Sequence, residues 1–471
     1  MSNHSTLQRS RYNYFVDREE GVIAYNARTG TFALLAEDVA AVLRGKEPIT
    51  QLRNTKNLVD MGFLHFDNEV EQVLSKFDSL KNQNSLLHLT LVPTLACNFS
   101  CDYCFQTEYR NARFMSPEIQ EATLSYVESL IASGRNEVVC TWFGGEPLLA
   151  KDIVLNMSQK LCSAIDTLGA RRLHMDIITN GILLNLETAK ELAAVGIKSA
   201  QVSFDALVFK NTKKRGIIDS SGNPSIILRN IKLARDYLNI KVRLNVSAEN
   251  MHEVPQIIDL LKEHGFAGSY GLARVHNHEN EYEFTTDSLG KRITSCGEGG
   301  CGSCGSSEPP KDLSSKTLSR SDYARFEWES FLSQPESFQE IVKKLQPKAH
   351  FCSATSGRMF VIDPAGYVSR CWHSAGSPSE SIDSVLASHT SMKNSDVEQR
   401  WKDFSLLAYP ACRNCKVLPL CMGGCSHPRI FTESPKPPCE SIKNQIQTSV
   451  DTIGKIIEIK PEQKELVSTG C

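Results

Sequence analysis

The strongest constraint on this chain is its sixteen cysteines, most of which fall into three clusters. The chain starts with MSNHSTLQRSRYNYF, which lacks the apolar core of an export signal, and no apolar run is long enough to cross a membrane. We therefore expect a cytoplasmic protein. Because structural disulfides are disfavoured in that reducing compartment, clustered thiols there indicate metal ligands or redox groups.

The three clusters differ in their spacing. They comprise Cys97, Cys101 and Cys104; Cys296, Cys301 and Cys304; and Cys352, Cys371, Cys412, Cys415, Cys421, Cys425 and Cys439. The isolated Cys140, Cys162 and Cys471 are expected to be ordinary small side chains, and both Cys140, which has apolar surroundings, and Cys162 are predicted to be buried.

Length and composition indicate a globular protein with several domains. The chain has 471 residues, of which 41% are hydrophobic and 23% charged, so two or three domains with large cores are expected. The net charge is −2, and no long block of like charge occurs. Nucleic acid is therefore excluded as a main partner, and neither a membrane nor a second copy is expected.

The order of predicted elements divides the chain into four parts. Residues 1–85 contain three short strands and two short helices, which indicate a winged-helix-like unit that is either a structural cap or a docking module. In residues 86–280 strands and helices alternate, with six strands, which predicts an α/β fold, a partial (β/α)6 TIM-type barrel with its active site at the carboxyl ends of the strands. Residues 281–348 form a bridging region around the second cysteine cluster, and 349–471 form a thiol-rich domain with a C-terminal helix.

The first cluster, C97-x3-C101-x2-C104, directly follows the first barrel strand. Three thiolates on one loop can hold three corners of a [4Fe–4S] cluster and leave one iron open, whereas a zinc or structural thiol site normally brings four ligands. This spacing, with the aromatic Tyr103 before the last thiol, resembles the radical S-adenosylmethionine superfamily. The resemblance implies that S-adenosylmethionine binds the open iron and is cleaved to a 5′-deoxyadenosyl radical, which abstracts a hydrogen atom from the substrate.

Other segments of the barrel extend this resemblance. Gly144-Gly145-Glu146-Pro147 ends the second strand, where the family has its GGEP motif, and glycines would let the backbone approach the methionyl ammonium. The resemblance implies cofactor contacts at Tyr103, beside the adenine, and at Gly144, Gly145, Glu146, Pro147, Asn180, Ser203, Arg243 and Asn245. Asp205 ends the fourth strand and is a candidate general base, although such acids also cap helices.

The third cluster resembles the SPASM domain of radical S-adenosylmethionine enzymes that modify peptides. The resemblance implies an outer auxiliary iron–sulfur cluster held by Cys412, Cys415, Cys421 and Cys439, and an inner one held by Cys352, Cys371 and Cys425. The inner cluster is one ligand short. Its fourth iron is open to substrate, or is bound by His350 or His373, or takes a thiol from the second cluster. For the glycine-rich second cluster we favour cluster ligation over a flexible loop with incidental thiols.

These resemblances imply a peptide-modifying enzyme. The N-terminal unit would bind the leader of a ribosomally made precursor as an added strand, and flavodoxin or ferredoxin would supply electrons. Two auxiliary clusters favour a net oxidation, so we expect carbon–carbon or ether crosslinks between side chains, as in darobactin-like and cyclophane products.

Several other functions stay open. They are thioether formation, epimerisation, and protein oxidation of the anaerobic sulfatase-maturase type. Trp372 stands where sulfatase maturases usually have an acid, which disfavours the last of these. A small-molecule or folded-protein substrate is a further possibility. A non-catalytic electron carrier is disfavoured because it would gain nothing from an open iron.

Overall fold

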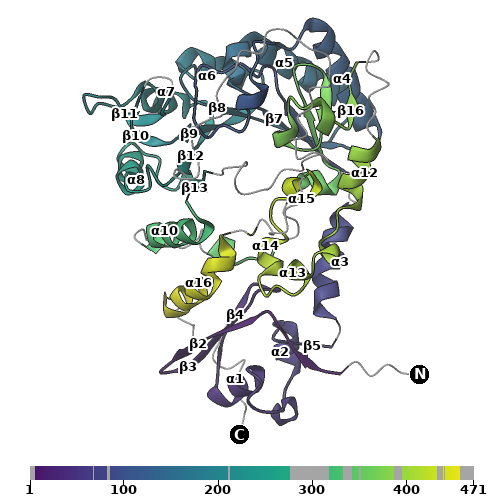
Figure 1. Cartoon of the computed structure of the whole chain (residues 1–471), viewed down its shortest axis with the longest axis vertical. Helices are drawn as coiled ribbons and strands as arrows, with labels where there is room; N and C mark the ends of the chain where they lie inside the picture. The colour runs from purple at the N-terminus through teal and green to yellow at the C-terminus, as the bar shows by residue number, and fades with distance from the viewer. Residues whose placement is uncertain are drawn as a thin grey trace, which may run out of the picture.

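The structure is a computed structural model that describes residues 6–66, 68–81, 85–210, 213–275, 318–332, 342–348, 352–386, 395–431, 439 and 441–456. A large α/β part lies at one end of the molecule, a small sheet-containing N-terminal unit at the other, and short helices of the cysteine-rich segment between them (Figure 1). Within these ranges, none of the helices has the length and apolar character needed to span a bilayer.

The α/β part is built on a nine-stranded sheet with the order β13-β12-β9-β8-β7-β6-β14-β15-β16. The six predicted strands are all present and parallel to their neighbours. They are β6 (Leu86–Leu91), β7 (Glu137–Trp142), β8 (Arg172–Thr179), β9 (Ile197–Phe204), β12 (Asn239–Val246) and β13 (Tyr270–Arg274). The mostly parallel α/β sheet is thus confirmed, and it is consistent with a partial TIM-type barrel.

The sheet continues beyond the predicted strands. β14 (Met359–Ile362) pairs in parallel with β6, and β15 (Tyr367–Ser369) and β16 (Asp383–Ser384) follow it in antiparallel order. The cysteine-rich segment therefore shares one sheet with the barrel. This extension was not predicted, because strands of two to four residues leave little periodicity to detect.

In the described part of the chain, five helices connect the parallel strands. They are α4 (Pro117–Ala132), α5 (Lys151–Leu168), α6 (Leu186–Ala194), α7 (Ile226–Ala234) and α8 (Val254–Glu263). Three of them, α4, α6 and α7, begin at polar capping residues. Ser116, Asn185 and Ser225 each accept a hydrogen bond from the backbone N–H three residues later, at 3.3, 2.9 and 3.2 Å. Each cap satisfies one of the amides that a helix start leaves unpaired.

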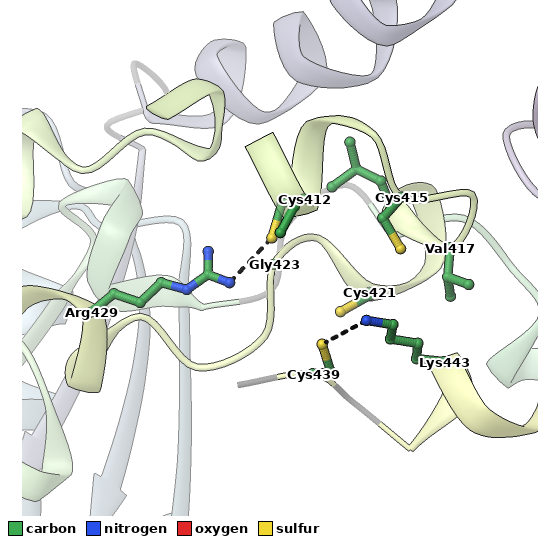
Figure 2. Close-up of a pocket in the computed structure, with 10 residues that line it drawn as sticks. Cys412, Cys415, Val417, Cys421, Gly423, Arg429, Cys439 and Lys443 are labelled. Carbon is green, nitrogen blue, oxygen red and sulfur yellow. Dashed lines mark hydrogen bonds between the residues drawn. The ribbon is translucent and has the colours of Figure 1, made fainter. Parts of the chain in front are cut away.

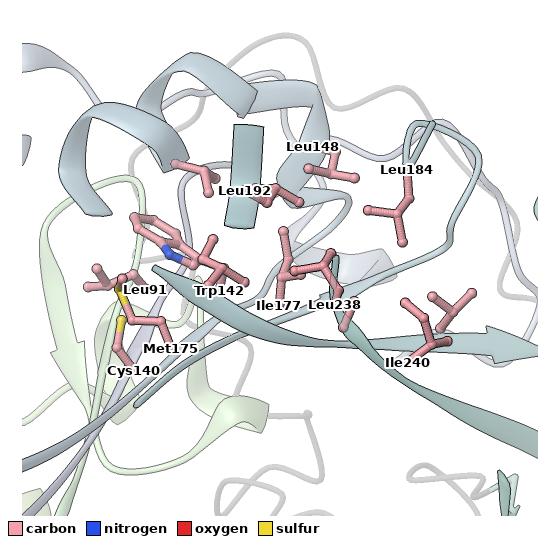
Figure 3. Close-up of a cluster of buried hydrophobic side chains, with 14 of the residues drawn as sticks. Leu91, Cys140, Trp142, Leu148, Met175, Ile177, Leu184, Leu192, Leu238 and Ile240 are labelled. Carbon is pink, nitrogen blue, oxygen red and sulfur yellow. The ribbon is translucent and has the colours of Figure 1, made fainter. Parts of the chain in front are cut away.

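The core lies between these helices and the sheet (Figure 3). Trp142 is fully buried, and its indole N–H donates to Ser158 Oγ at 3.0 Å, so its polar atom is satisfied. Cys140 is also fully buried, as predicted. The prediction that Cys162 is buried is wrong: it is half-buried, because it flanks the buried face of α5 that includes Leu161 and Ile165, and its Sγ is 3.7 Å from the carbonyl oxygen of Val195.

The N-terminal unit contains the predicted elements. β2 (Asn13–Arg18), β3 (Gly21–Asn26) and β4 (Thr31–Leu35) form an antiparallel sheet, and β1 (Gln8–Arg9) pairs with β5 (Leu64–His65). Its helices are α1 (Glu37–Leu43), η1 (Ile49–Gln51) and α2 (Lys56–Asp60), and α3 (Glu69–Lys81) leads toward the barrel. The winged-helix-like character of this unit stays a prediction.

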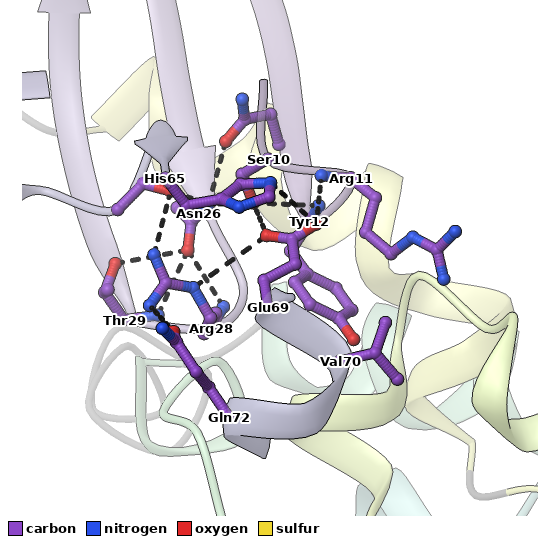
Figure 4. Close-up of polar contacts among 12 residues, drawn as sticks. Ser10, Arg11, Tyr12, Asn26, Arg28, Thr29, His65, Glu69, Val70 and Gln72 are labelled. Carbon is purple, nitrogen blue, oxygen red and sulfur yellow. Dashed lines mark hydrogen bonds and ion pairs between the residues drawn. The ribbon is translucent and has the colours of Figure 1, made fainter. Parts of the chain in front are cut away.

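A buried polar network joins this sheet to α3 (Figure 4). The carboxylate of Glu69 accepts hydrogen bonds from Ser10 Oγ at 2.7 Å and from the backbone N–H of Arg11 at 2.6 Å. The Asn26 side chain donates to Ser10 Oγ and to the carbonyl of Gly62, at 2.9 and 2.8 Å. Because both Asn26 and Glu69 are buried, the network fixes α3 against the sheet.

Replacing Asn26 with Ala should loosen this unit locally. The side-chain oxygen of Asn26 also accepts hydrogen bonds from the backbone N–H groups of Arg28 and Thr29. The variant therefore leaves several polar groups without their hydrogen-bond partner. We expect a cost of about 2 kcal/mol, roughly a 30-fold faster exchange of protected amides in residues 10–30, measured by hydrogen exchange of the full chain. Gln51→Ala, which removes an exposed hydrogen bond, is the control. Equal exchange in both variants would contradict the role of the network.

The rest of the chain adds short elements around the thiols. They are η2 (Thr107–Tyr109), η3 (Pro147–Ala150), β10 (Ala206–Val208), β11 (Gly216–Ile218), α10 (Arg320–Leu332), η6 (Ser353–Ser356), η7 (Trp372–Ser374), η8 (Pro378–Glu380), α12 (Ser395–Asp403), η10 (Leu406–Ala408), α13 (Pro410–Arg413), α14 (Leu418–Cys421), α15 (His427–Phe431) and α16 (Ile442–Ile456). The predicted C-terminal helix is thus confirmed as α16. Cys296, Cys301, Cys304, His350 and Cys471 lie outside the described residues, so the predictions about them stay untested.

Candidate active site and thiol clusters

The residues predicted to carry the chemistry gather at one edge of the sheet. Cys97 follows β6, Gly144 follows β7, Asn180 follows β8, Asp205 follows β9, and Asn245 lies near the end of β12. Since these strands are parallel neighbours, their carboxyl ends share one edge. The fold therefore brings together side chains that lie far apart in the sequence.

The first thiol cluster occupies a tight loop. The backbone N–H of Cys104 donates to the carbonyl of Cys101 at 3.1 Å, and that of Phe99 donates to Cys97 Sγ at 3.3 Å. Burial raises the pKa of Cys101 to about 11, and the nearby thiols of Cys104 and Cys97 add to the shift. The three thiols therefore lie on one tightly turned segment, as a cluster-binding loop would require.

No group of three or more His, Cys, Asp or Glu side chains in the described ranges is spaced to hold a single metal ion. The binding of an iron–sulfur cluster by Cys97, Cys101 and Cys104 stays a prediction, made from their number and spacing.

Gly144 and Gly145 pack directly against the backbone that leads into this loop. Gly145 donates its N–H to the Thr94 carbonyl at 3.2 Å, and Glu146 donates to the Ala96 carbonyl at 2.8 Å. A Cβ on Gly145 would lie 2.2 Å from the Ala96 oxygen, closer than any real contact. The absence of side chains thus lets two backbone segments meet. The predicted approach of these glycines to the cofactor stays a prediction.

The carboxylate of Glu146 is fully buried and joins two strand ends. It accepts hydrogen bonds from Leu148 N at 3.0 Å, Thr179 Oγ1 at 2.7 Å and Asn180 N at 2.7 Å. Burial raises its pKa, although these donors oppose the shift. Pro147, also buried, begins η3. The side chain of Glu146 therefore holds these two strand ends together, and its predicted contact with the cofactor stays a prediction.

Asn180 links the same region to the thiol loop. Its Nδ2 donates to Asn98 Oδ1 at 2.7 Å, and its Oδ1 accepts from Ile182 N at 3.1 Å. Asn98 was not predicted as a site residue, although its place next to Cys97 was a usable signal. The contact holds the carboxyl end of β8 against the cysteine loop.

Tyr103 and Asp205 meet in a buried polar network. The Tyr103 hydroxyl donates to Asp205 Oδ2 at 2.6 Å and accepts from Asn245 Nδ2 at 3.0 Å. Arg215 pairs with Asp205 at 2.9 Å and also contacts the Tyr103 hydroxyl. The side chains of Arg215 and Asp205 are 12% and 2% exposed. A carboxylate that accepts this many hydrogen bonds is suited to holding its neighbouring side chains in position. The predicted role of Asp205 as a general base stays a prediction.

Two further predicted residues lie beside this network. Arg243 Nε donates to Asn245 Oδ1 at 2.9 Å, and Ser203 is the buried residue opposite Arg243 in the register of β9 and β12. The structure thus places both within the same wall of the site.

Sequence reasoning missed Arg215 and Asn250. Arg215 lies in the basic stretch KNTKKRG, which looks like a solvated loop, and the parallel pairing of β10 with β11 returns it to Asp205. Asn250 donates to the carbonyls of Asp205 and Asn245 at 2.8 and 2.7 Å. The only sequence signal for Asn250 was the run of polar residues that directly follows β12.

The four thiols assigned to the outer cluster line one pocket (Figure 2). They are Cys412, Cys415, Cys421 and Cys439. Arg429 Nη2 donates to Cys412 Sγ at 3.1 Å, and Lys443 Nζ donates to Cys439 Sγ at 3.4 Å. The charge of Cys439 raises the pKa of Lys443. Four thiols lining one pocket are a ligand set that fits an iron–sulfur cluster, and the two cations would offset its negative charge.

The three thiols assigned to the inner cluster come from three separate segments. Cys371 follows β15, Cys352 precedes η6 and Cys425 lies between α14 and α15. Burial raises the pKa of Cys371 well above its usual value, and the charges of Cys352 and Cys425 add to it. The three thiols therefore act on one another electrostatically, and their binding of a single cluster stays a prediction.

Aromatic side chains lie between the first thiol loop and the inner thiols. Phe105, which follows Cys104, packs against His373 with ring centroids 4.4 Å apart. Trp372 stacks on Phe143 at 5.0 Å and donates its indole N–H to Thr90 Oγ1 at 2.8 Å. These rings form an aromatic wall beside the carboxyl edge of the sheet.

Comparison with known proteins agrees with this geometry. Residues 91–261 match the family model of the radical SAM superfamily. Among curated proteins, the chain is 28% identical over 171 residues to Fe-coproporphyrin III synthase of Methanosarcina barkeri, and 31% identical over 164 residues to GTP 3′,8-cyclase of Peptoclostridium acidaminophilum. These matches cover 36% and 34% of this chain, but only 39% and 45% of the relatives' lengths.

Solved structures show the same fold over more of the chain. The structure of native anSMEcpe with bound AdoMet aligns with a TM-score of 0.54 and 17% identity, covering 79% of this chain and 100% of that one. The structure of anSMEcpe with AdoMet and the Cp18Cys peptide aligns with a TM-score of 0.53 and 16% identity, covering 79% and 99%.

Proposed function

We propose that this chain, whose residues 91–261 are a radical SAM domain, oxidatively crosslinks side chains of a ribosomally synthesised precursor peptide. Cys97, Cys101 and Cys104 would hold the [4Fe–4S] cluster of this domain. When bound, the cluster and S-adenosylmethionine supply a 5′-deoxyadenosyl radical, which removes a hydrogen atom from the substrate. The network of Tyr103, Asp205 and Arg215 would form the wall of the site beside the cluster and S-adenosylmethionine.

The observation that carries this proposal is the pair of additional thiol sets. Four thiols line the outer pocket, and Cys371, whose thiol interacts electrostatically with Cys352 and Cys425, directly precedes the aromatic-wall residues Trp372 and His373. A crosslink forms when a substrate carbon radical bonds to a second side chain and then loses an electron and a proton. That electron needs an acceptor, which auxiliary clusters at the two thiol sets would provide. Epimerisation, which is redox-neutral for the peptide, would need none.

The N-terminal unit supports a peptide substrate. Within the described residues β4 pairs with β3 alone, so its outer edge is available for an added strand. The solved structure of anSMEcpe with the Cp18Cys peptide shows that a protein of this fold binds a peptide. The leader would bind to the N-terminal sheet while the core segment enters at the aromatic wall.

The test is mass spectrometry of a candidate precursor peptide after anaerobic incubation with the reduced enzyme and S-adenosylmethionine. We expect a loss of about two hydrogens per crosslink, with formation of 5′-deoxyadenosine, and tandem fragmentation locates the bond. Unchanged peptide mass with deuterium uptake in heavy water would instead show epimerisation and contradict the proposal.

A single variant separates the radical step from the oxidation. Cys371→Ser should still form 5′-deoxyadenosine but should lose the crosslinked product, because the inner cluster is removed from the electron path. Cys162→Ser, which changes a half-buried thiol outside all three clusters, should retain both. Full crosslinking by Cys371→Ser would contradict the role given to the inner thiols.

A further inference from the structure

The inner thiols supply three ligands, whereas a closed cluster usually takes four. Next to them lies a paired histidine and glutamate. His427, the first residue of α15 and two residues after Cys425, has its Nε2 2.8 Å from Glu380 Oε2. The ring of His427 also lies 5.4 Å from that of His373, which is two residues after Cys371, so the pair lies beside the thiol set.

Two further hydrogen bonds hold Glu380 in place. Ser374 Oγ donates to the same carboxylate oxygen at 2.6 Å, and the backbone N–H of Glu380 donates to the Ser377 carbonyl at 3.2 Å. The carboxylate can therefore fix the orientation of the imidazole. Histidines that bind metals commonly donate their other ring N–H to such a carboxylate.

We propose that His427 is the fourth ligand of the inner cluster, binding iron through Nδ1, with Glu380 as its positioning residue. The contact with Glu380 occupies Nε2, which leaves Nδ1 as the nitrogen available to a metal. This inference rests on the proposed function, because the inner cluster is part of it.

A histidine ligand would suit an electron acceptor. A neutral imidazole carries less negative charge than a thiolate, and replacing cysteines by histidines raises the potential of Rieske clusters. The inner cluster would therefore take an electron from a substrate radical more readily than a cluster bound by four thiolates.

His373 is less suited to this position. Its backbone N–H donates to the Cys371 sulfur, while its ring packs against Phe105 and lies 5.4 Å from the ring of His427. These contacts place the ring of His373 in the aromatic wall. The remaining competitors are an open iron, His350, and a thiol from Cys296, Cys301 or Cys304, so the experiment must distinguish each of these from His427.

The test uses the full chain, reconstituted anaerobically without S-adenosylmethionine and labelled with 15N-histidine. Pulsed electron paramagnetic resonance of the reduced protein should show a nitrogen coupling that changes from 14N to 15N with the label. His427→Cys should keep the iron content, lose this coupling and lower the midpoint potential of the inner cluster. His373→Ala should keep the coupling, and a Cys296/Cys301/Cys304→Ser variant should keep both the coupling and the iron.

The outcomes separate this inference from the proposed function. About twelve iron atoms per chain without a histidine coupling would overturn His427 as a ligand and leave the three clusters in place. A coupling that persists in His427→Cys would overturn it as well. About eight iron atoms in the wild-type chain would overturn the inner cluster and, with it, this inference.

Discussion

Replacing Cys97, Cys101 and Cys104 together with Ala is expected to abolish the cleavage of S-adenosylmethionine. The three thiols lie on one loop at the carboxyl end of β6 and interact electrostatically with each other. Without them the radical SAM domain has no site for its cluster, so 5′-deoxyadenosine formation should fall to background. The iron content should fall by about four atoms per chain, because the auxiliary thiols are unchanged.

The measurement is 5′-deoxyadenosine by chromatography, together with iron and sulfide analysis of each anaerobically reconstituted protein. Cys162→Ala is the matched control, since that thiol is half-buried on α5 and lies outside all three cysteine clusters. It should keep the wild-type rate and iron content. Cleavage that persists in the triple variant would contradict the assignment of the radical site.

The sequence predicted those parts of the fold that follow from local pattern. Strands such as β7 (Glu137–Trp142) alternate with amphipathic helices that begin at capping residues such as Ser116, so both periodicities are present in the sequence. The thiol sets were predictable because their spacing is itself the signal. The structure accordingly brings together Cys412 and Cys439, which lie in separate segments.

The residues that sequence reasoning missed are positioned by long-range contacts. Arg215 reaches Asp205 only because β10 and β11 pair in parallel across a short insertion. Likewise, His427 meets Glu380 across nearly fifty residues of loops and short helices. Neither contact leaves a periodicity in the sequence, because each depends on how the loops close over the sheet.

The GGEP segment, residues 144–147, makes a contact that was not predicted. The glycines were expected to admit the cofactor, whereas the structure shows Gly145 packed against the backbone that carries Cys97. The loop and the motif therefore support each other directly. A side chain at position 145 would disrupt this contact.

Gly145→Ala is expected to reduce 5′-deoxyadenosine formation at least about a hundredfold, because small displacements of a catalytic loop are costly. The new Cβ would lie 2.2 Å from the Ala96 oxygen and 2.5 Å from the Leu95 oxygen. Both obstacles are backbone atoms, so no side-chain rotation can relieve the clash. The clash must therefore displace either residues 94–96 or the GGEP segment. A displacement of residues 94–96 would also move Cys97.

Gly271→Ala, in β13, is the matched control, because its added Cβ would meet nothing within 4 Å and Gly271 likewise lacks a positive φ. Both variants should be compared by deoxyadenosine rate at saturating S-adenosylmethionine and by iron content. A Gly145→Ala rate within about threefold of the control would contradict the packing argument, since so small a loss means that the loop tolerates displacement. Reduced iron content together with the lost rate would show that the glycine acts by holding the cysteine loop in its cluster-binding conformation, before the cofactor arrives.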